Sequence, residues 1–109
     1  MEKQSFEPAK KYNLETSIEV AQGGGVSKQF IKNHGGKITL FAFDKGQGLS
    51  EHTAPYDAMV RILDGEALIT IDGKEFALKD GQSIIMPANV PHALNANVRF
   101  KMILTMLRK

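Results

Sequence analysis

The sequence carries Asp-Gly pairs at a constant interval of eight residues, at 64–65, 72–73 and 80–81. Both residue types tolerate the positive φ that tight β-hairpin turns require. The segments between the pairs, EALITI and KEFAL, are too short for a helix and alternate apolar with polar residues. The pattern predicts a meander of short strands that turns at all three pairs, with a positive φ at each glycine.

The same two-residue alternation continues on both sides of this meander, in KITLFAF, AMVRIL and VRFKMILTML. In the last segment Phe100, Met102, Leu104 and Met106 share one face, which we expect to lie inside. Residues 26–109 therefore read as one all-β sandwich or barrel. Residues 1–25 have no clear period and are expected to form an arm, either a short helix or an edge strand, that also serves as a dimer contact.

Composition narrows the classes of function. A chain of 109 residues with 42% hydrophobic and 24% charged residues suits a single globular domain. It has no cysteine, which excludes disulfides and thiolate sites. The net charge of +2 is scattered, so no nucleic-acid surface is expected. No apolar run is long enough for a membrane span, and the polar start MEKQSFEPAKKYNLE is unlike a signal peptide, so we expect a cytoplasmic protein.

Two histidines stand in glycine and proline frames of fixed spacing. Five residues separate Gly46 from His52, and the second frame, GQSIIMPANVPHAL, places His92 directly after a proline. Fifteen residues separate the end of the first frame, Gly65, from the start of the second, Gly81. This arrangement resembles the small single-domain cupins of the conserved-barrel type, including stand-alone bacterial proteins often without assigned activity. The resemblance covers Gly46 to about Leu107.

The resemblance implies a double-stranded β-helix, or jelly-roll barrel, with both histidines at one end. It also implies a divalent metal ion (Zn, Fe, Ni, Mn or Cu) with His52 and His92 as ligands. Alanines stand at positions 54 and 58, where the family pattern has a second histidine and a glutamate. Three interpretations stay open: hydrogen-bonded histidines without metal, a weakly held ion completed by water, or a functional centre with another ligand.

An apolar cavity is expected beside the histidines, because alanine replaces two polar ligands. The side chains expected to line it or bind a ligand there are His52, Ala54, Ala58, His92, Phe41, Met59, Met86 and Met102, and Met106, Phe43 and Phe100 are further candidates for its lining. Alternatively, the methionines and the phenylalanines are ordinary core residues. The leading hypothesis is a cytoplasmic protein that binds a small molecule of unassigned identity. The alternatives are a metal-dependent enzyme of the dioxygenase or isomerase type and a non-catalytic interaction barrel. Cupins of this size commonly pair, so a homodimer is expected.

Overall fold

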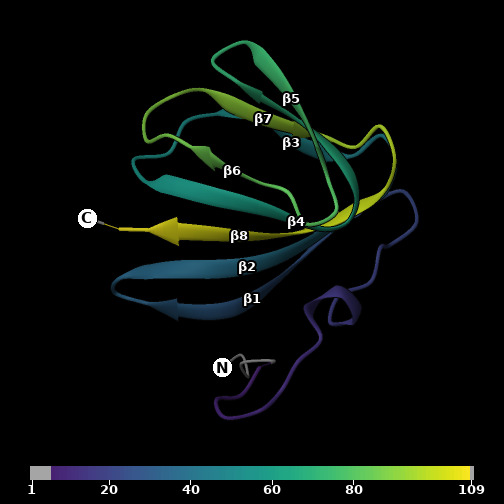
Figure 1. Cartoon of the computed structure of the whole chain (residues 1–109), viewed down its shortest axis with the longest axis vertical. Helices are drawn as coiled ribbons and strands as arrows, with labels where there is room; N and C mark the ends of the chain where they lie inside the picture. Colours follow the sequence, from purple (N-terminus) through teal and green to yellow (C-terminus); the bar gives the residue numbers. More distant parts are fainter. Residues whose placement is uncertain (1–5, 109) are drawn as a thin grey trace.

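The computed structural model of the chain describes residues 6–108, and strands make up nearly all of the regular secondary structure within them (Figure 1). Its one short helix, η1, is a 3-10 turn at Leu14–Thr16. The strands are β1 (Gly25–Asn33), β2 (Gly36–Phe43), β3 (Gly48–His52), β4 (Asp57–Ile71), β5 (Lys74–Lys79), β6 (Ser83–Met86), β7 (His92–Asn95) and β8 (Phe100–Leu107). The all-β expectation is confirmed.

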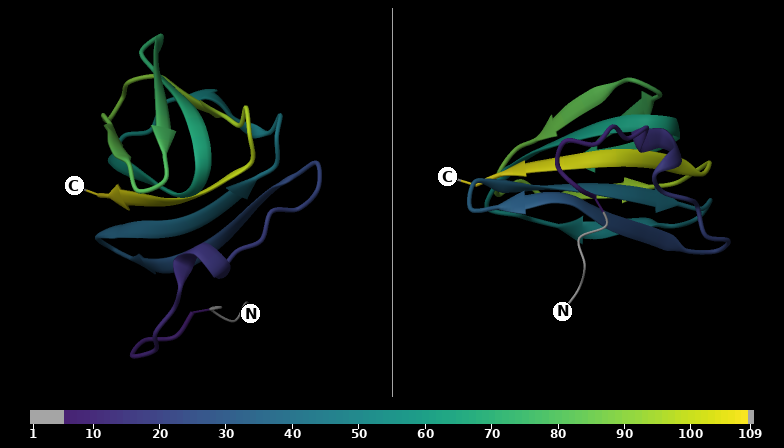
Figure 2. Two further views of the ribbon diagram at one scale, coloured as in Figure 1. Left: turned by 45° about the vertical axis from the view of Figure 1, so that its right-hand side comes forward. Right: turned by 90° about the horizontal axis from the view of Figure 1, so that it is seen from below.

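The strands pair in antiparallel fashion in the order β1-β2-β8-β4-β7-β3, with β5 and β6 also paired to β4. The first half of β4 lies between β8 and β6, and its second half lies between β5 and β7. One strand thus belongs to two sheets, which curl around a common interior (Figure 2). This is the double-sheet jelly roll implied by the sequence.

The Asp-Gly pair at 64–65 does not form a hairpin turn, and that expectation was wrong. The strand β4 continues through this pair without a turn. The pairing of β4 with β8 shifts register between Ile62 and Asp64, which marks a β-bulge. Inward residues are even-numbered before the bulge (Ala58, Val60, Ile62) and odd-numbered after it (Ala67, Ile69). The bulge therefore bends β4 from one sheet into the other while keeping an apolar side chain inside.

The other two pairs do turn the chain, in different ways. Asp72 and Gly73 have φ of 51° and 78° and close the β4–β5 hairpin, as expected of a tight turn. Gly81 has a φ of 80°, but the strand that follows pairs with β4 instead of β5. The positive φ predicted for the three glycines is confirmed, since Gly65 has a φ of 88°. The predicted simple meander is not confirmed, because β4 pairs with four other strands.

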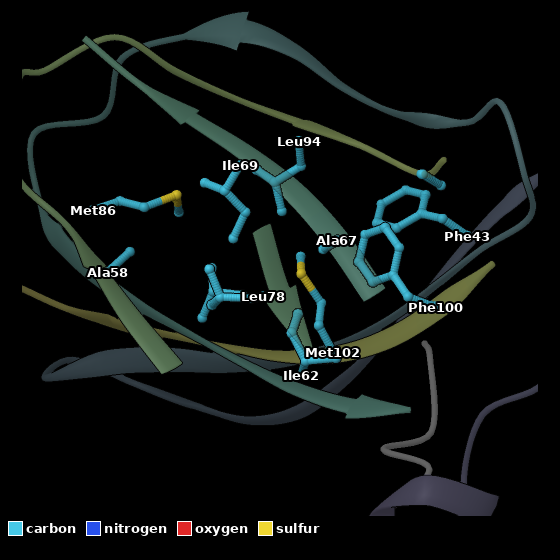
Figure 3. Close-up of a cluster of buried hydrophobic side chains, with 12 residues drawn as sticks. Phe43, Ala58, Ile62, Ala67, Ile69, Leu78, Met86, Leu94, Phe100 and Met102 are labelled. Atoms are coloured by element: carbon cyan, nitrogen blue, oxygen red, sulfur yellow. The ribbon is translucent and has the colours of Figure 1, made fainter. Parts of the chain in front are cut away.

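The main core lies between the two sheets (Figure 3). Phe100 and Met102 are buried in it, and Leu104 and Met106 pack against it partly exposed. The interior face predicted for this strand, β8, is therefore confirmed. The buried cluster comprises Phe43, Ala58, Val60, Ile62, Ala67, Ile69, Leu78, Met86, Leu94, Ala96, Phe100 and Met102.

Residues 6–24 cross the outer face of β1 and β2 without forming a strand (Figure 1). Phe6 and Ile18 are buried there in a second cluster with Leu40 and Ala42 of β2. Ile103, on the outer face of β8, packs against the same cluster. Residues 1–5 of the arm and residue 109 lie outside the described residues, and the dimer contact stays a prediction. No helix within residues 6–108 is long and apolar enough to cross a bilayer.

Candidate functional site

The two framed histidines meet at one end of the barrel. His52 ends β3, His92 begins β7, and the two residues are direct partners in the register of these strands. Their Nε2 atoms are 3.1 Å apart, and the ring centroids are 4.4 Å apart in an edge-to-face arrangement. The His92 side chain is 4% exposed, whereas His52 is exposed. We refer to these two residues as the histidine pair.

Backbone carbonyls fix the tautomer of each ring. The Nδ1 of His52 lies 2.7 Å from the carbonyl oxygen of Ser50, and the Nδ1 of His92 lies 3.1 Å from that of Val90. A carbonyl oxygen only accepts, so each Nδ1 must be the N–H donor. In a neutral imidazole the other nitrogen then carries a lone pair and no hydrogen. The facing Nε2 atoms are therefore both acceptors when both rings are neutral.

The surroundings of His92 favour that neutral form. Burial lowers the pKa of His92 below 6.5, its ordinary value, because a charged ring loses hydration there. The hydrogen bond to Val90 opposes this shift of the pKa, and the nearby His52 ring adds to it. At neutral pH His92 therefore presents an unprotonated Nε2, which is the form that binds metal ions.

A small cavity of about 40 Å³ lies beside the histidine pair. Its walls are apolar apart from the two rings, and the residues that line it are Leu49, His52, Ala54, Ala58, Met86, His92, Leu94, Met102, Leu104 and Met106. Organic ligands typically need 300–1,000 Å³. A volume near 40 Å³ holds an ion, a few waters or a molecule of a few atoms.

Most of the residues expected at the site do line this cavity. The exceptions are Met59, Phe41, Phe43 and Phe100, of which Phe43 and Phe100 are buried in the main core. Met59 is 39% exposed on the outer face of β4, because its parity is opposite to that of the inward Ala58. Phe41 stacks on Phe43 at 5.7 Å and packs against the main core.

Three lining residues were not expected at the site: Leu49, Leu94 and Leu104. The two-residue alternation of the strands could have identified two of them. Leu104 shares the inward face of Met102, and Leu94 shares that of His92.

No carboxylate completes the histidine pair. Among residues 6–108 no three His, Cys, Asp or Glu side chains gather where they could hold an ion. Asp57 Oδ1 accepts a hydrogen bond from the Ala88 backbone N–H at 2.9 Å, and Glu51 is exposed. The donors at this cavity are therefore the two imidazoles and the thioether sulfurs of its methionines.

Comparison with known proteins agrees with the fold. The family model described as "Cupin domain" matches residues 39–106. A conserved protein of unknown function from Streptococcus pyogenes is 40% identical, with a TM-score of 0.89, over 94% of this chain and 90% of its own. A cupin superfamily protein from Desulfitobacterium hafniense is 29% identical, with a TM-score of 0.88, over 95% of each chain.

More distant matches show the fold alone. Salicylate 1,2-dioxygenase from Pseudoaminobacter salicylatoxidans is 13% identical, with a TM-score of 0.72, over 77% of this chain and 25% of its own. No curated protein matches the sequence. The family model covers more than half of the chain, and the Streptococcus protein aligns over nearly all of it. The chain therefore belongs to the cupin family, as a small barrel of the cupin-2 type.

Proposed function

We propose that the protein binds a metal ion between His52 and His92. The observation that carries this proposal is the 3.1 Å separation of two Nε2 atoms whose rings both use Nδ1 as donor. Two lone pairs at this distance repel each other unless a cation lies between or beside them. A proton on Nε2 of the exposed His52 would satisfy both rings, as would a metal ion that accepts both lone pairs.

The spacing of the pair suits shared coordination. Two imidazole nitrogens at about 2.0–2.1 Å from one tetrahedral ion lie roughly 3.3–3.4 Å apart. The observed 3.1 Å is close to this value. The carbonyls that hold Nδ1 of each ring fix its orientation, as outer-shell partners of metal-binding histidines do.

The size and lining of the cavity limit which molecules can bind beside such an ion. A bound ion supplies Lewis acidity to whatever molecule binds beside it. His92 is a buried anchor, and His52 lies at the exposed mouth, from which a molecule would enter. Leu49, Leu94 and Leu104 keep the walls apolar. A volume of about 40 Å³ restricts the partner to water or a molecule of a few atoms, so the small-molecule hypothesis narrows to ligands of that size.

Calorimetric titration of the untagged apoprotein with Zn²⁺ tests the proposal, alongside His52→Ala, His92→Ala and His34→Ala. The matched control, His34, is an exposed histidine outside the cavity, in the turn between β1 and β2. We expect about one ion per chain for wild type and His34→Ala, with each cavity variant at least about tenfold weaker. Absence of binding by the wild type, or equal loss in His34→Ala, would contradict the proposal.

A further inference from the structure

We infer that the ion preferred by this cavity is monovalent copper, Cu(I), held by the histidine pair together with the thioether sulfurs of Met86 and Met106. This inference rests on the proposed function and specifies its metal. Three features carry it: where the methionines stand, which donor types are present, and how little negative charge the cavity offers.

The two methionines flank the position of the missing carboxylate. Ala58, where the family pattern has a glutamate, pairs directly with Met86 of β6 on one side and with Met106 of β8 on the other. Directly opposite residues in antiparallel strands share a face, with Cβ atoms about 4.5–5.5 Å apart. Both side chains therefore border the space that the small Ala58 leaves open, and both line the same cavity as the histidine pair.

The two methionines differ in burial, since Met86 is buried and Met106 is partly exposed. Met86 is 3% exposed, and its side chain extends into the barrel interior beside Ala58 (Figure 3). A third methionine, Met102, is fully buried and forms part of the deeper wall. Half of the ten residues that line this cavity of about 40 Å³ carry potential ligand atoms, in two imidazoles and three thioethers.

The donor types select a soft ion. Thioether sulfur is a soft ligand that favours Cu(I), and imidazole also suits copper. Hard ions such as Mg²⁺ and Mn²⁺ favour carboxylate, carbonyl and water oxygens. Ala58 removes the carboxylate of the family pattern, and Asp57 already accepts a hydrogen bond from Ala88. The disagreement with the family's ligand pattern is therefore a change of donor class as well as a loss of two ligands.

The absence of a carboxylate among these ligands also favours a monovalent ion. Every donor named here is neutral, so nothing in the cavity walls compensates the charge of a bound ion. The free-energy cost of moving an ion out of water grows with the square of its charge, so a monovalent ion costs about a quarter of a divalent ion of equal size. In an apolar cavity with neutral ligands the desolvation cost is therefore lower for Cu(I) than for a divalent ion.

Anaerobic competition with a chromophoric Cu(I) chelator tests this inference, alongside Zn²⁺ titration of the same samples. The variant is Met86→Leu/Met106→Leu, which keeps side-chain volume nearly constant. The matched control is Met59→Leu, on the outer face of the same strand as Ala58. We expect wild type and control to bind Cu(I) at least about 100-fold more tightly than Zn²⁺. The double variant should lose at least about tenfold in Cu(I) affinity and less than about twofold in Zn²⁺ affinity.

X-ray absorption of the wild-type Cu(I) complex gives a second readout that does not depend on the variant's folding. We expect a sulfur shell in addition to nitrogen. A spectrum with nitrogen and oxygen neighbours only, a Zn²⁺ preference, or unchanged Cu(I) affinity in a folded double variant overturns the copper inference and leaves the proposed histidine site standing. Failure of wild type to bind either ion overturns both.

Discussion

His52 and His92 face each other as direct partners across β3 and β7, yet only His92 is buried. The His92 ring is held inside the barrel, and the His52 ring contacts it from the exposed mouth of the cavity. In the metal-free protein with both rings neutral, this arrangement places two unprotonated Nε2 atoms 3.1 Å apart. The contact should therefore contribute little or nothing to stability until a cation joins it.

This asymmetry makes the effect of His52→Ala dependent on metal. Without metal we expect the free energy of unfolding to change by less than about 0.5 kcal/mol, since the residue is exposed and its contact is unfavourable. With Zn²⁺ at about 100 times its Kd, wild type should gain roughly 2.7 kcal/mol. The variant, with an affinity at least about tenfold weaker, should gain no more than roughly 1.4 kcal/mol. Denaturant unfolding with and without metal measures both, and an equal gain in the two proteins would contradict this.

Restoring the two missing ligands should convert the cavity to a divalent site. In Ala54→His/Ala58→Glu the new side chains start from positions that already line the cavity. We expect Zn²⁺ affinity to rise at least about 100-fold, because four protein ligands replace two. Ala54→His/Ala58→Gln is the size-matched control without the carboxylate. Calorimetric titration compares the three proteins. A Zn²⁺ affinity no higher than that of wild type would show that side chains at positions 54 and 58 do not reach an ion bound to the histidine pair.

Two glycines with similar φ should respond differently to alanine. At Gly73, φ +78°, a Cβ meets nothing nearby, so Gly73→Ala should cost about 1–2 kcal/mol in stability from backbone strain alone. At Gly65, φ +88°, the Cβ would collide with the Arg99 carbonyl and crowd Phe100. Gly65→Ala should cost at least about 2 kcal/mol more than Gly73→Ala.

Gly24→Ala is the control for this pair, because its Cβ would meet no atom closer than 3.8 Å and its φ is not positive. Equal costs for Gly65→Ala and Gly73→Ala in denaturant unfolding would mean that β4 tolerates movement at its bulge.

Asp44 should give a pH-dependent contribution to stability. Backbone hydrogen bonds from Gly23 and Lys45 lower the pKa of this carboxyl below its ordinary 3.8. A carboxyl whose pKa is lower in the folded state stabilises fully above the unfolded pKa, and the contribution is lost as pH falls through the folded pKa. The stability difference between wild type and Asp44→Asn should therefore be largest near neutral pH and shrink below about pH 3.8.

Asp80→Asn, at another exposed turn, is the control for this pH series. A difference between wild type and Asp44→Asn that persists at the acid end of the unfolding series would show that the carboxylate charge is not its cause.

The segment before β1 should behave as part of the folded domain. Ile18 is fully buried in the cluster on the outer face of β2. Ile18→Ala should lower the free energy of unfolding by about 2–5 kcal/mol. Ile85→Ala, at a side chain that is 65% exposed, should change it by less than about 0.5 kcal/mol. Similar small costs for both would mean that the arm packs only loosely.

Local patterns in the sequence predicted the features that local chemistry controls. Alternation predicted the inward face of β8, and the spaced frames identified the two histidines that meet. The Asp-Gly pair at 64–65 misled because the same dipeptide serves a tight turn or a bulge. The difference is decided by β8, whose residue Phe100 pairs with Gly65 from far along the chain. The cavity volume was equally beyond reach, since it depends on how Leu49, Leu94 and Leu104 pack around the alanines.

The position of β8 in the sheet has a consequence for the order of folding. Within residues 6–108, the hairpin of β1 and β2 is joined to β4 in the sheet only through this strand, which is the last of the eight described strands to be synthesised. The early hairpin can form on the ribosome, but it cannot dock onto β4 until residues 100–107 have emerged. Closure is thus a late, long-range event, and barrels held together by distant pairings fold slowly. Until that moment the nascent chain exposes the free edges of β2 and β4, the period in which it most needs protection from aggregation.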